Sequence, residues 1–126
     1  MSGSAMAAET QARRAEWLAA MRWRRRVETT LRETGLTFTQ WLLLTGASEL
    51  IAARDDAVSQ QEIAASVELD CGTVSQVVHT LVDKDMLSFD LDMGGKAWRI
   101  FLSDRAERVL SELQERVAAV SFPGYR

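Results

Sequence analysis

The sequence predicts a mainly α-helical fold with one small β-hairpin near its C-terminal end. Apolar residues recur at helical spacing over most of the chain, whereas between residues 87 and 102 they alternate with polar ones, as in strands. With 126 residues, 47% of them hydrophobic and 26% charged, the chain has the size and balance of one globular domain. We therefore expect a single domain over residues 9–126, preceded by a disordered N-terminus or tag at residues 1–8.

Two helices are predicted in the first part of the chain. Residues 9–33 contain no Pro or Gly and carry apolar residues at helical spacing, and Gly35 ends this stretch. The segment Thr37-Phe-Thr-Gln40 matches a capping box, in which the threonine oxygen accepts from a first-turn amide and the glutamine reaches back to the cap. We expect a second helix over residues 38–53 to begin there.

Two shorter helices follow in the middle of the chain. Ser59-Gln-Gln-Glu62 is another capping box and opens a helix that runs to about residue 66. Asp70 is a suitable N-cap for a helix to about residue 84, whose apolar face holds Val74, Val77, Val78 and Leu81. Because only a tight turn separates the two helices, the pair is predicted to be a helix-turn-helix unit.

A hairpin and a closing helix complete the pattern. Apolar residues at 87, 89 and 91 and at 98, 100 and 102 predict two strands, with Met93-Gly-Gly-Lys96 as the turn. Ser103 or Asp104 caps a last helix over residues 104–120, and Pro123-Gly124 ends it. The order of elements over residues 37–103 is that of a winged helix-turn-helix, whose second helix enters the major groove of DNA while the hairpin lies against a minor groove.

The polar face of the second helix of the pair holds the candidate DNA-binding residues. Gln76 can pair with N6 and N7 of an adenine. Lys84, at the end of the helix, and Lys96, at the tip of the wing, are candidates for phosphate contacts. The alternative is a solvated polar face with no ligand. The full set of candidates is Thr73, Ser75, Gln76, His79, Thr80, Lys84 and Lys96.

Several motifs between residues 36 and 110 point to a known family. They are Thr39-Gln-Trp-Leu-Leu-Leu44, Ile63-Ala64, Val74-Ser75, the run from Leu81 to Leu87, and Phe101-Leu-Ser103. With these motifs the sequence resembles the MarR family of bacterial regulators. The resemblance implies a cytoplasmic, sequence-specific regulator of transcription that binds double-stranded DNA, a repressor released by a small aromatic or lipophilic effector. It also implies a homodimer, held together by dimerisation helices at residues 9–34 and 104–120.

The charge of the winged region stands against this implication. Residues 59–103 contain three basic and seven acidic residues. The family usually has arginine where this chain has Gln76 and Thr80, and an Asp-Arg-Arg-like run where it has Gly94-Gly95-Lys96. Because phosphate neutralisation supplies most of the non-specific affinity for DNA, a second function stays open. It is a winged-helix protein-interaction module that has lost DNA binding.

The basic charge lies in the first helix instead. Residues 1–35 contain seven arginines and four glutamates, and the cluster Arg22-Trp-Arg-Arg-Arg26 is the densest part. This cluster either holds phosphates or an acidic partner, or it is a solvated face beside the dimer interface. Trp17 and Trp23 can line a crevice for the effector; the alternative is that they pack in the core.

No residues are predicted to catalyse a reaction or to bind a metal or cofactor. Cys71 and His79 are eight residues apart on one helix, about 12 Å along its axis, which is too far for a nucleophile and its base. His79 and Asp83 offer only two metal ligands. As the single cysteine, Cys71 can at most act as an oxidation sensor with an intermolecular partner. No apolar run is long enough to span a membrane, and we expect a non-enzymatic, cytoplasmic protein.

Overall fold

The fold is mainly α-helical with one two-stranded antiparallel sheet, as the sequence predicts. The computed structural model describes residues 2–91 and 98–120. In chain order its elements are α1 (Ser2–Leu31), the 3-10 turn η1 (Arg32–Thr34), α2 (Phe38–Arg54), α3 (Gln60–Val67), α4 (Cys71–Asp83), β1 (Leu87–Leu91), β2 (Trp98–Leu102) and α5 (Asp104–Ala118).

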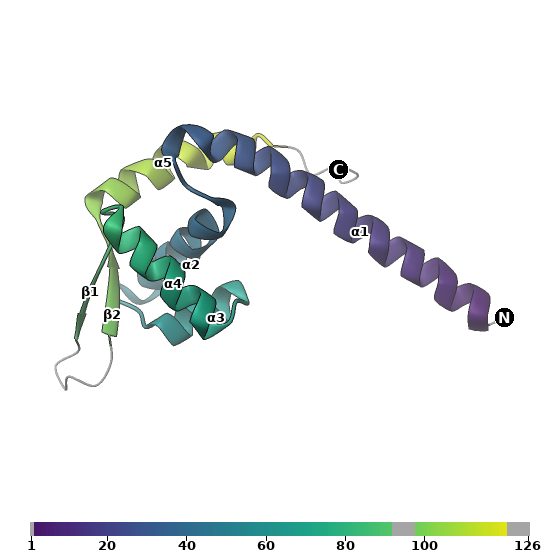
Figure 1. The fold of residues 1–126 in the computed structure, drawn as a ribbon, viewed down its shortest axis with the longest axis horizontal. Coiled ribbons are helices and arrows are strands. Elements are labelled where there is room, and N and C mark those ends of the chain that lie inside the picture. The colour runs from purple at the N-terminus through teal and green to yellow at the C-terminus, as the bar shows by residue number, and fades with distance from the viewer. Residues whose placement is uncertain (1, 92–97, 121–126) are drawn as a thin grey trace.

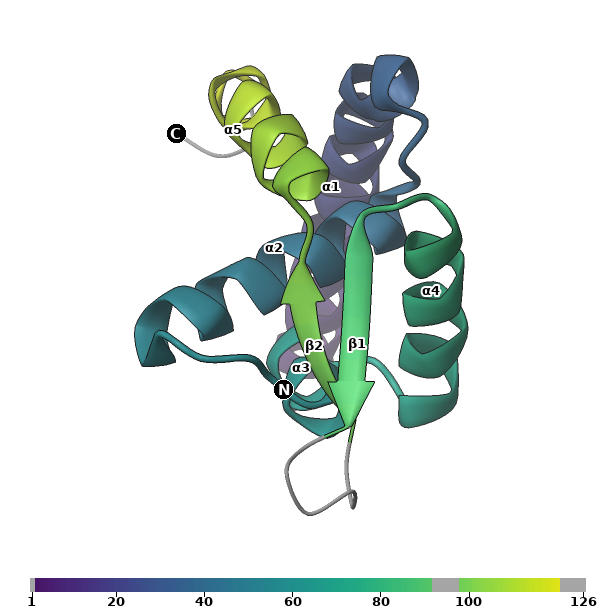
Figure 2. The same ribbon diagram turned by 90° about the vertical axis from the view of Figure 1, so that its left-hand side faces the viewer.

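The elements form a compact head and an extended arm. Helices α2, α3 and α4 gather behind the two strands, and α3 and α4 form the helix-turn-helix (Figure 2). The C-terminal half of α1 runs beside α5 on top of this head, whereas its N-terminal half projects well beyond the rest of the molecule (Figure 1). An ion pair between Glu33 of η1 and Arg116, 3.0 Å long, links the turn that follows α1 to α5.

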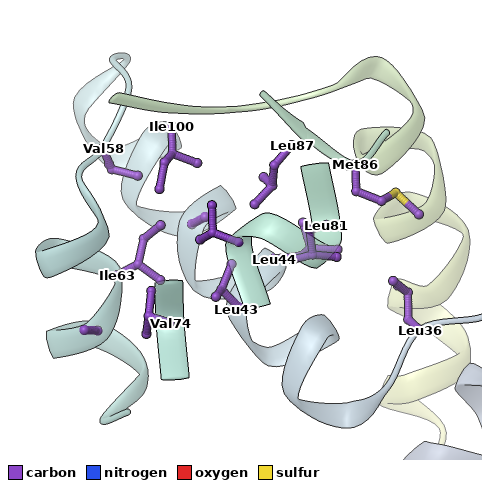
Figure 3. Close-up of a cluster of buried hydrophobic side chains, with 14 of the residues drawn as sticks. Leu36, Leu43, Leu44, Val58, Ile63, Val74, Leu81, Met86, Leu87 and Ile100 are labelled. Atoms are coloured by element: carbon purple, nitrogen blue, oxygen red, sulfur yellow. The ribbon is translucent and has the colours of Figure 1, made fainter. Parts of the chain in front are cut away.

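The core lies where α2 meets α3, α4 and the hairpin. One cluster holds Leu43 and Leu44 of α2, Ile63 of α3, Leu81 of α4 and Ile100 of β2 (Figure 3). All five side chains are completely buried. Because these apolar side chains come from four different elements, their burial decides how the helices are oriented.

The starts of helices α2 to α5 are as predicted, because each depends on a local hydrogen bond. The Thr37 hydroxyl oxygen accepts from Gln40 N at 3.1 Å, and Gln40 Oε1 accepts from Thr37 N at 3.1 Å. The second capping box has the same form, with both bonds 3.2 Å long. Asp70 caps α4 and Ser103 caps α5.

The structure differs from the expectation at the two ends of the chain. Residues 2–8, expected to be disordered, form the first turns of α1, because Ala5-Met-Ala-Ala8 is rich in strong helix formers and contains no proline. Helix α5 ends at Ala118, two residues before the predicted end. The predicted turn Met93–Lys96 and the stop signal Pro123-Gly124 lie outside the described residues.

A third chain segment pairs with the hairpin, which the sequence does not predict. Strands β1 and β2 pair in the predicted antiparallel way, with Leu87 opposite Leu102 and Phe89 opposite Ile100. On the other edge of β2, Val58 and Ile100 exchange two backbone hydrogen bonds of 3.3 and 2.7 Å. Val58 is a single bridging residue without an alternating pattern around it, so the sequence of residues 54–58 does not predict a strand.

A glycine allows a close contact between α2 and α3. A Cβ on Gly46 of α2 would lie 2.5 Å from Cγ1 of Val67 in α3. No real Cβ contact is that short, and the β-branched Val67 side chain has little rotamer freedom in a helix. Gly46 therefore allows α3 to lie flat against α2.

We expect Gly46→Ala to destabilise the fold, although alanine is the better helix former. The overpacking cost of about 1–3 kcal/mol outweighs the helix-propensity gain of about 1 kcal/mol. Urea unfolding of Gly46→Ala, Val67→Ala and the double variant measures the effect. Because Val67→Ala removes the clashing methyl group, the double variant should be more stable than the sum of the two single changes predicts. Simple additivity would contradict the close approach.

Candidate nucleic-acid interface

Helix α4 buries one face and presents the predicted polar residues on the other. Val74, Val78 and Leu81 are completely buried against the core. Gln76, His79 and Thr80 are exposed, and Thr73 and Ser75 are half-buried beside them. No other described helix or strand lies over the outer face of α4 (Figure 2). The five α4 candidates, Thr73, Ser75, Gln76, His79 and Thr80, are therefore brought together on one open surface.

Intramolecular contacts already orient several of these side chains. The Thr73 hydroxyl donates to Asp70 Oδ2 at 2.8 Å, and the Thr80 hydroxyl donates to the carbonyl of Gln76 at 3.1 Å. The His79 ring lies against Phe89 of β1, with 6.0 Å between ring centroids. Among the described residues, no partner binds the Gln76 amide, so both its donor and its acceptor are available to a ligand.

The N-terminus of α4 is held by Asp70, which also affects how that carboxylate titrates. The backbone N–H of Thr73 donates to Asp70 Oδ1 at 2.8 Å. This bond, followed by that from the Thr73 hydroxyl, lowers the pKa of Asp70 below its ordinary value of 3.8. The charged form of Asp70 thus stabilises the helix that carries the candidate residues.

Lys84 has a structural role that the sequence does not predict. Its ammonium group donates to the carbonyl oxygen of Gly35 at 2.8 Å and to Gln40 Oε1 at 2.9 Å. Gln40 is buried, and its Oε1 also accepts from Thr37 N. Lys84 therefore joins the end of α4 to the turn between α1 and α2. With two acceptors already bound, its ammonium is poorly placed for the predicted phosphate contact.

The base of the wing is tied to the loop before α3. Arg99 of β2 donates to Asp56 Oδ2 at 2.6 Å and to the carbonyl of Ala57 at 3.0 Å. The backbone N–H of Ala57 lowers the pKa of Asp56, and the hydrogen bond from Arg99 lowers it further. An ion pair between Arg54 and Glu62 closes the other side of this loop. The partners of Arg99 are more than 40 positions away in the sequence, and the pair Arg54 and Glu62 belongs to no recognisable motif. The sequence therefore did not predict these contacts.

The interface is poor in positive charge. No lysine or arginine occurs in α3, α4 or β1. The side chains of Asp83, Asp85 and Asp90 are exposed at or after the end of α4. Lys96, the predicted contact at the tip of the wing, lies outside the described residues. A phosphate beside α3, α4 or β1 would therefore meet hydrogen-bonding groups of these elements rather than lysine or arginine side chains.

The two tryptophans proposed for an effector crevice are not brought together. Trp17 lies on the projecting part of α1 with 60% of its surface exposed. Trp23 is half-buried and packs against Phe38 and Trp41, with ring centroids 5.9 and 6.3 Å away. Its surroundings match the alternative reading, a core position at the junction of α1 and α2. Six residues apart on one helix, the two rings also leave it in different directions.

The described residues, 2–91 and 98–120, show two further absences. No helix there is long and apolar enough to cross a membrane. The described side chains also contain no group of three or more metal-binding residues. Cys71 is exposed at the first position of α4, next to the candidate DNA-binding residues.

Comparison with known proteins gives one similar sequence. No family model matches the chain. Over 71 residues it is 35% identical to an uncharacterized HTH-type transcriptional regulator, YdcH, of Bacillus subtilis (strain 168). The match covers 56% of this chain and 48% of the Bacillus protein, so the chain spans about half the length of that relative.

Solved structures extend the similarity to nearly the whole fold. A MarR-family transcriptional regulator from Rhodococcus sp. RHA1 aligns with a TM-score of 0.73 at 23% identity, covering 85% of this chain and 75% of that one. CouR from Rhodococcus jostii RHA1, solved with p-coumaroyl-CoA, aligns at 0.71 and 22%, with the same coverage. Reduced AbfR bound to DNA aligns at 0.79 and 16%, covering 96% and 84% of the two chains. The fold is the winged helix-turn-helix of MarR-family transcriptional regulators.

We expect the stability of the protein to fall in acid partly through Asp70. Since its folded-state pKa is lowered, its contribution is present above pH 3.8 and is lost as the pH falls through the lower folded value. Urea midpoints measured from pH 6 to pH 2 should fall less steeply for Asp70→Asn, because asparagine is a comparable N-cap that does not titrate. Identical slopes for the two proteins would contradict this role.

Proposed function

We propose that the protein is a sequence-specific, DNA-binding transcriptional regulator without enzymatic activity. The observation that carries the proposal is the open polar face of α4, opposite three completely buried residues in a winged helix-turn-helix. AbfR, a protein with the same fold, was solved on DNA. The proposal accounts for a helix with one polar side that no other described element covers.

On this proposal α4 reads bases in the major groove. Gln76, exposed at the centre of the face, would pair with an adenine through its free amide. Ser75, His79 and Thr80 flank it, and Thr73 lies one turn nearer the N-terminus of α4. Lys96 on the wing would supply a phosphate contact. Because α3, α4 and β1 contain no lysine or arginine, binding would depend on base contacts and vary less with salt than is usual.

We further propose that the protein acts as a homodimer in the cytoplasm of a bacterium. The projecting half of α1 exposes Met6, Trp17 and Leu18 by 68%, 60% and 40%, an apolar surface that a second copy would cover. Helices α1 and α5 lie side by side, so together they can form the dimerisation surface (Figure 1). Two heads would double the number of base contacts, which compensates for few cations.

A ligand-responsive repressor is the form of regulation that we propose. CouR was solved with p-coumaroyl-CoA, and a mechanism involving 6-hydroxynicotinic acid is described for BpsR of Bordetella bronchiseptica. Both proteins share this fold, with TM-scores of 0.71 and 0.77. A small effector that alters DNA affinity is consistent with these two neighbours.

The charge of the head favours one other function. Seven acidic and three basic residues between positions 59 and 103 suit a winged-helix module that binds a basic protein and has lost DNA binding. In such a module the buried face of α4 would stabilise the fold, and the polar face would not contact DNA. The experiments below separate the two functions.

Selection from a random DNA pool at about 50 mM salt tests DNA binding directly. We expect a defined site to be enriched and Gln76→Ala to bind it about tenfold or more weakly, since one bidentate base contact is worth roughly 1–3 kcal/mol. Glu49→Ala, at an exposed position of α2 outside both the winged face and the proposed dimerisation surface, is the control and should bind normally. Retention of no DNA at this salt concentration would contradict the regulator and support the protein-interaction module.

Lys84→Gln tests whether that lysine contacts DNA or only supports the fold. Because its ammonium binds Gly35 and Gln40, we expect a less stable protein whose DNA affinity keeps the same dependence on salt. Lys96→Gln is the contrasting variant, and should lower the slope of log affinity against log salt by about 1 per subunit. An equal loss of slope in Lys84→Gln would show that this lysine reaches a phosphate after all.

Alkylation of Cys71 maps the binding face without any substitution. The thiol is the only one in the chain, and it is exposed in the first turn of α4. We expect the selected DNA to slow its reaction with a bulky maleimide at least severalfold, and the alkylated protein to lose DNA binding. An unchanged reaction rate in saturating DNA would place the DNA elsewhere on the molecule.

A further inference from the structure

A hollow lies between the C-terminal part of α2, strand β2 and the start of α5. Its volume is about 280 Å³, close to the lower limit of small-molecule sites, which is roughly 300 Å³. It is therefore large enough for a molecule with a single ring. Its lining consists of Ser48, Ile51, Ala52, Phe101, Leu102 and Glu107.

The walls of the hollow are apolar, and one of them is an unusually exposed aromatic ring. Phe101 points away from the core side of β2, where its neighbour Ile100 is buried, and 42% of its surface is exposed. Ser88, its partner across the hairpin, is exposed and too small to cover the ring. An aromatic face beside Ile51 and Leu102 offers a flat, apolar surface for another ring.

The polar part of the lining carries negative charge. Within residues 2–91 and 98–120, the carboxylate of Glu107 has no hydrogen-bond or ion-pair partner, and an ionised carboxylate only accepts hydrogen bonds. The Ser48 hydroxyl adds a group that can donate or accept. A ligand with a cationic donor beside an apolar ring satisfies both parts of the site, whereas an acid would be repelled by Glu107.

We propose that this hollow is an effector site for a small aromatic amine. The ring would lie on Phe101 between Ile51 and Leu102, and the ammonium group would bind Glu107. This chemistry is opposite to that of 6-hydroxynicotinic acid, the acid that regulates DNA binding of BpsR. The site also differs from the pair Trp17 and Trp23 that the sequence suggested. Its regulatory role rests on the proposed function, but ligand binding itself does not.

The contacts of β2 connect the hollow to the DNA-binding elements. Arg99 and Ile100, which directly precede Phe101, hold Asp56 and Val58 in the loop that leads into α3. Strand β2 is itself one of the two strands of the wing. A ring bound in the hollow would contact both α2 and β2 and would therefore fix their separation. It would also restrict this loop, and with it the position of α3 and the wing relative to α4.

Titration of the ¹⁵N-labelled protein with benzylamine, benzyl alcohol and benzoate tests the site. We expect benzylamine to bind most tightly and benzoate most weakly, with shifts centred on the amides of residues 51, 52, 101, 102 and 107. Glu107→Gln should weaken benzylamine binding about three- to tenfold and make it equal to benzyl alcohol. Glu112→Gln, an exposed acid on the same helix, should leave the order of affinities unchanged.

Ala52→Trp provides a second, independent variant. Residue 52 is exposed on α2, so the larger side chain can enter the hollow without entering the core. We expect it to abolish the benzylamine shifts while the rest of the spectrum stays folded. Benzoate binding as tight as benzylamine, or benzylamine shifts located elsewhere, would overturn the proposal. So would concentration-dependent shifts of the hollow without any amine, because a second copy would then fill it.

The regulatory role has its own measurement, so that its failure is distinct from that of DNA binding. On the selected DNA site, saturating benzylamine should change the affinity of the unmodified protein at least threefold and leave that of Ala52→Trp unchanged. Equal affinity with and without bound benzylamine would overturn the effector role. If the protein retains no DNA, the proposed function fails while the benzylamine titration still decides whether the hollow binds amines.

Discussion

The burial of α2 against α3, α4 and β2 is the constraint on which the remaining structure depends. Helices α3 and α4 have 8 and 13 residues, lengths at which an isolated helix is marginal in water. They persist because Ile63, Val74 and Leu81 are buried on Leu43 and Leu44. The orientation of α4 is therefore fixed by its apolar side, and the open polar face that we assign to DNA is its consequence.

The molecule combines a winged helix-turn-helix fold with an α4 surface that is poor in positive charge. A surface without lysine or arginine in α3, α4 or β1 attracts phosphates weakly, so on the proposed function recognition would come from hydrogen bonds such as those we propose for Gln76. Such a protein would gain specificity from base edges and little affinity from the phosphate backbone. The doubled contacts of the proposed dimer would then matter more than in a protein with a basic DNA-binding head, and this would connect the projecting arm of α1 to the proposed function of α4.

Three kinds of contact connect the parts of the molecule. Lys84 joins the end of α4 to the turn between α1 and α2, and Arg99 joins β2 to the loop before α3. The third is the packing around the amine-sized hollow, which includes α2, β2 and α5. Each contact links a candidate binding element to a segment distant in sequence. A change in the arm or in the hollow can thus reach the DNA-binding face through a few side chains.

The sequence by itself determined the starts of α2 to α5, the strand pairing and the polar face of α4. Capping boxes, N-caps and periodicity are local, and Thr37, Ser59 and Asp70 bind residues only three positions away. Tertiary structure alone decided what distant residues do. The partners of Lys84 are 49 and 44 positions away, and neither the Val58–Ile100 bridge, the Gly46 contact nor the hollow leaves a periodic trace. Capping hydrogen bonds and apolar periodicity involve residues close together in the sequence, so they can be recognised from the sequence alone. Long-range contacts depend on how the completed elements pack.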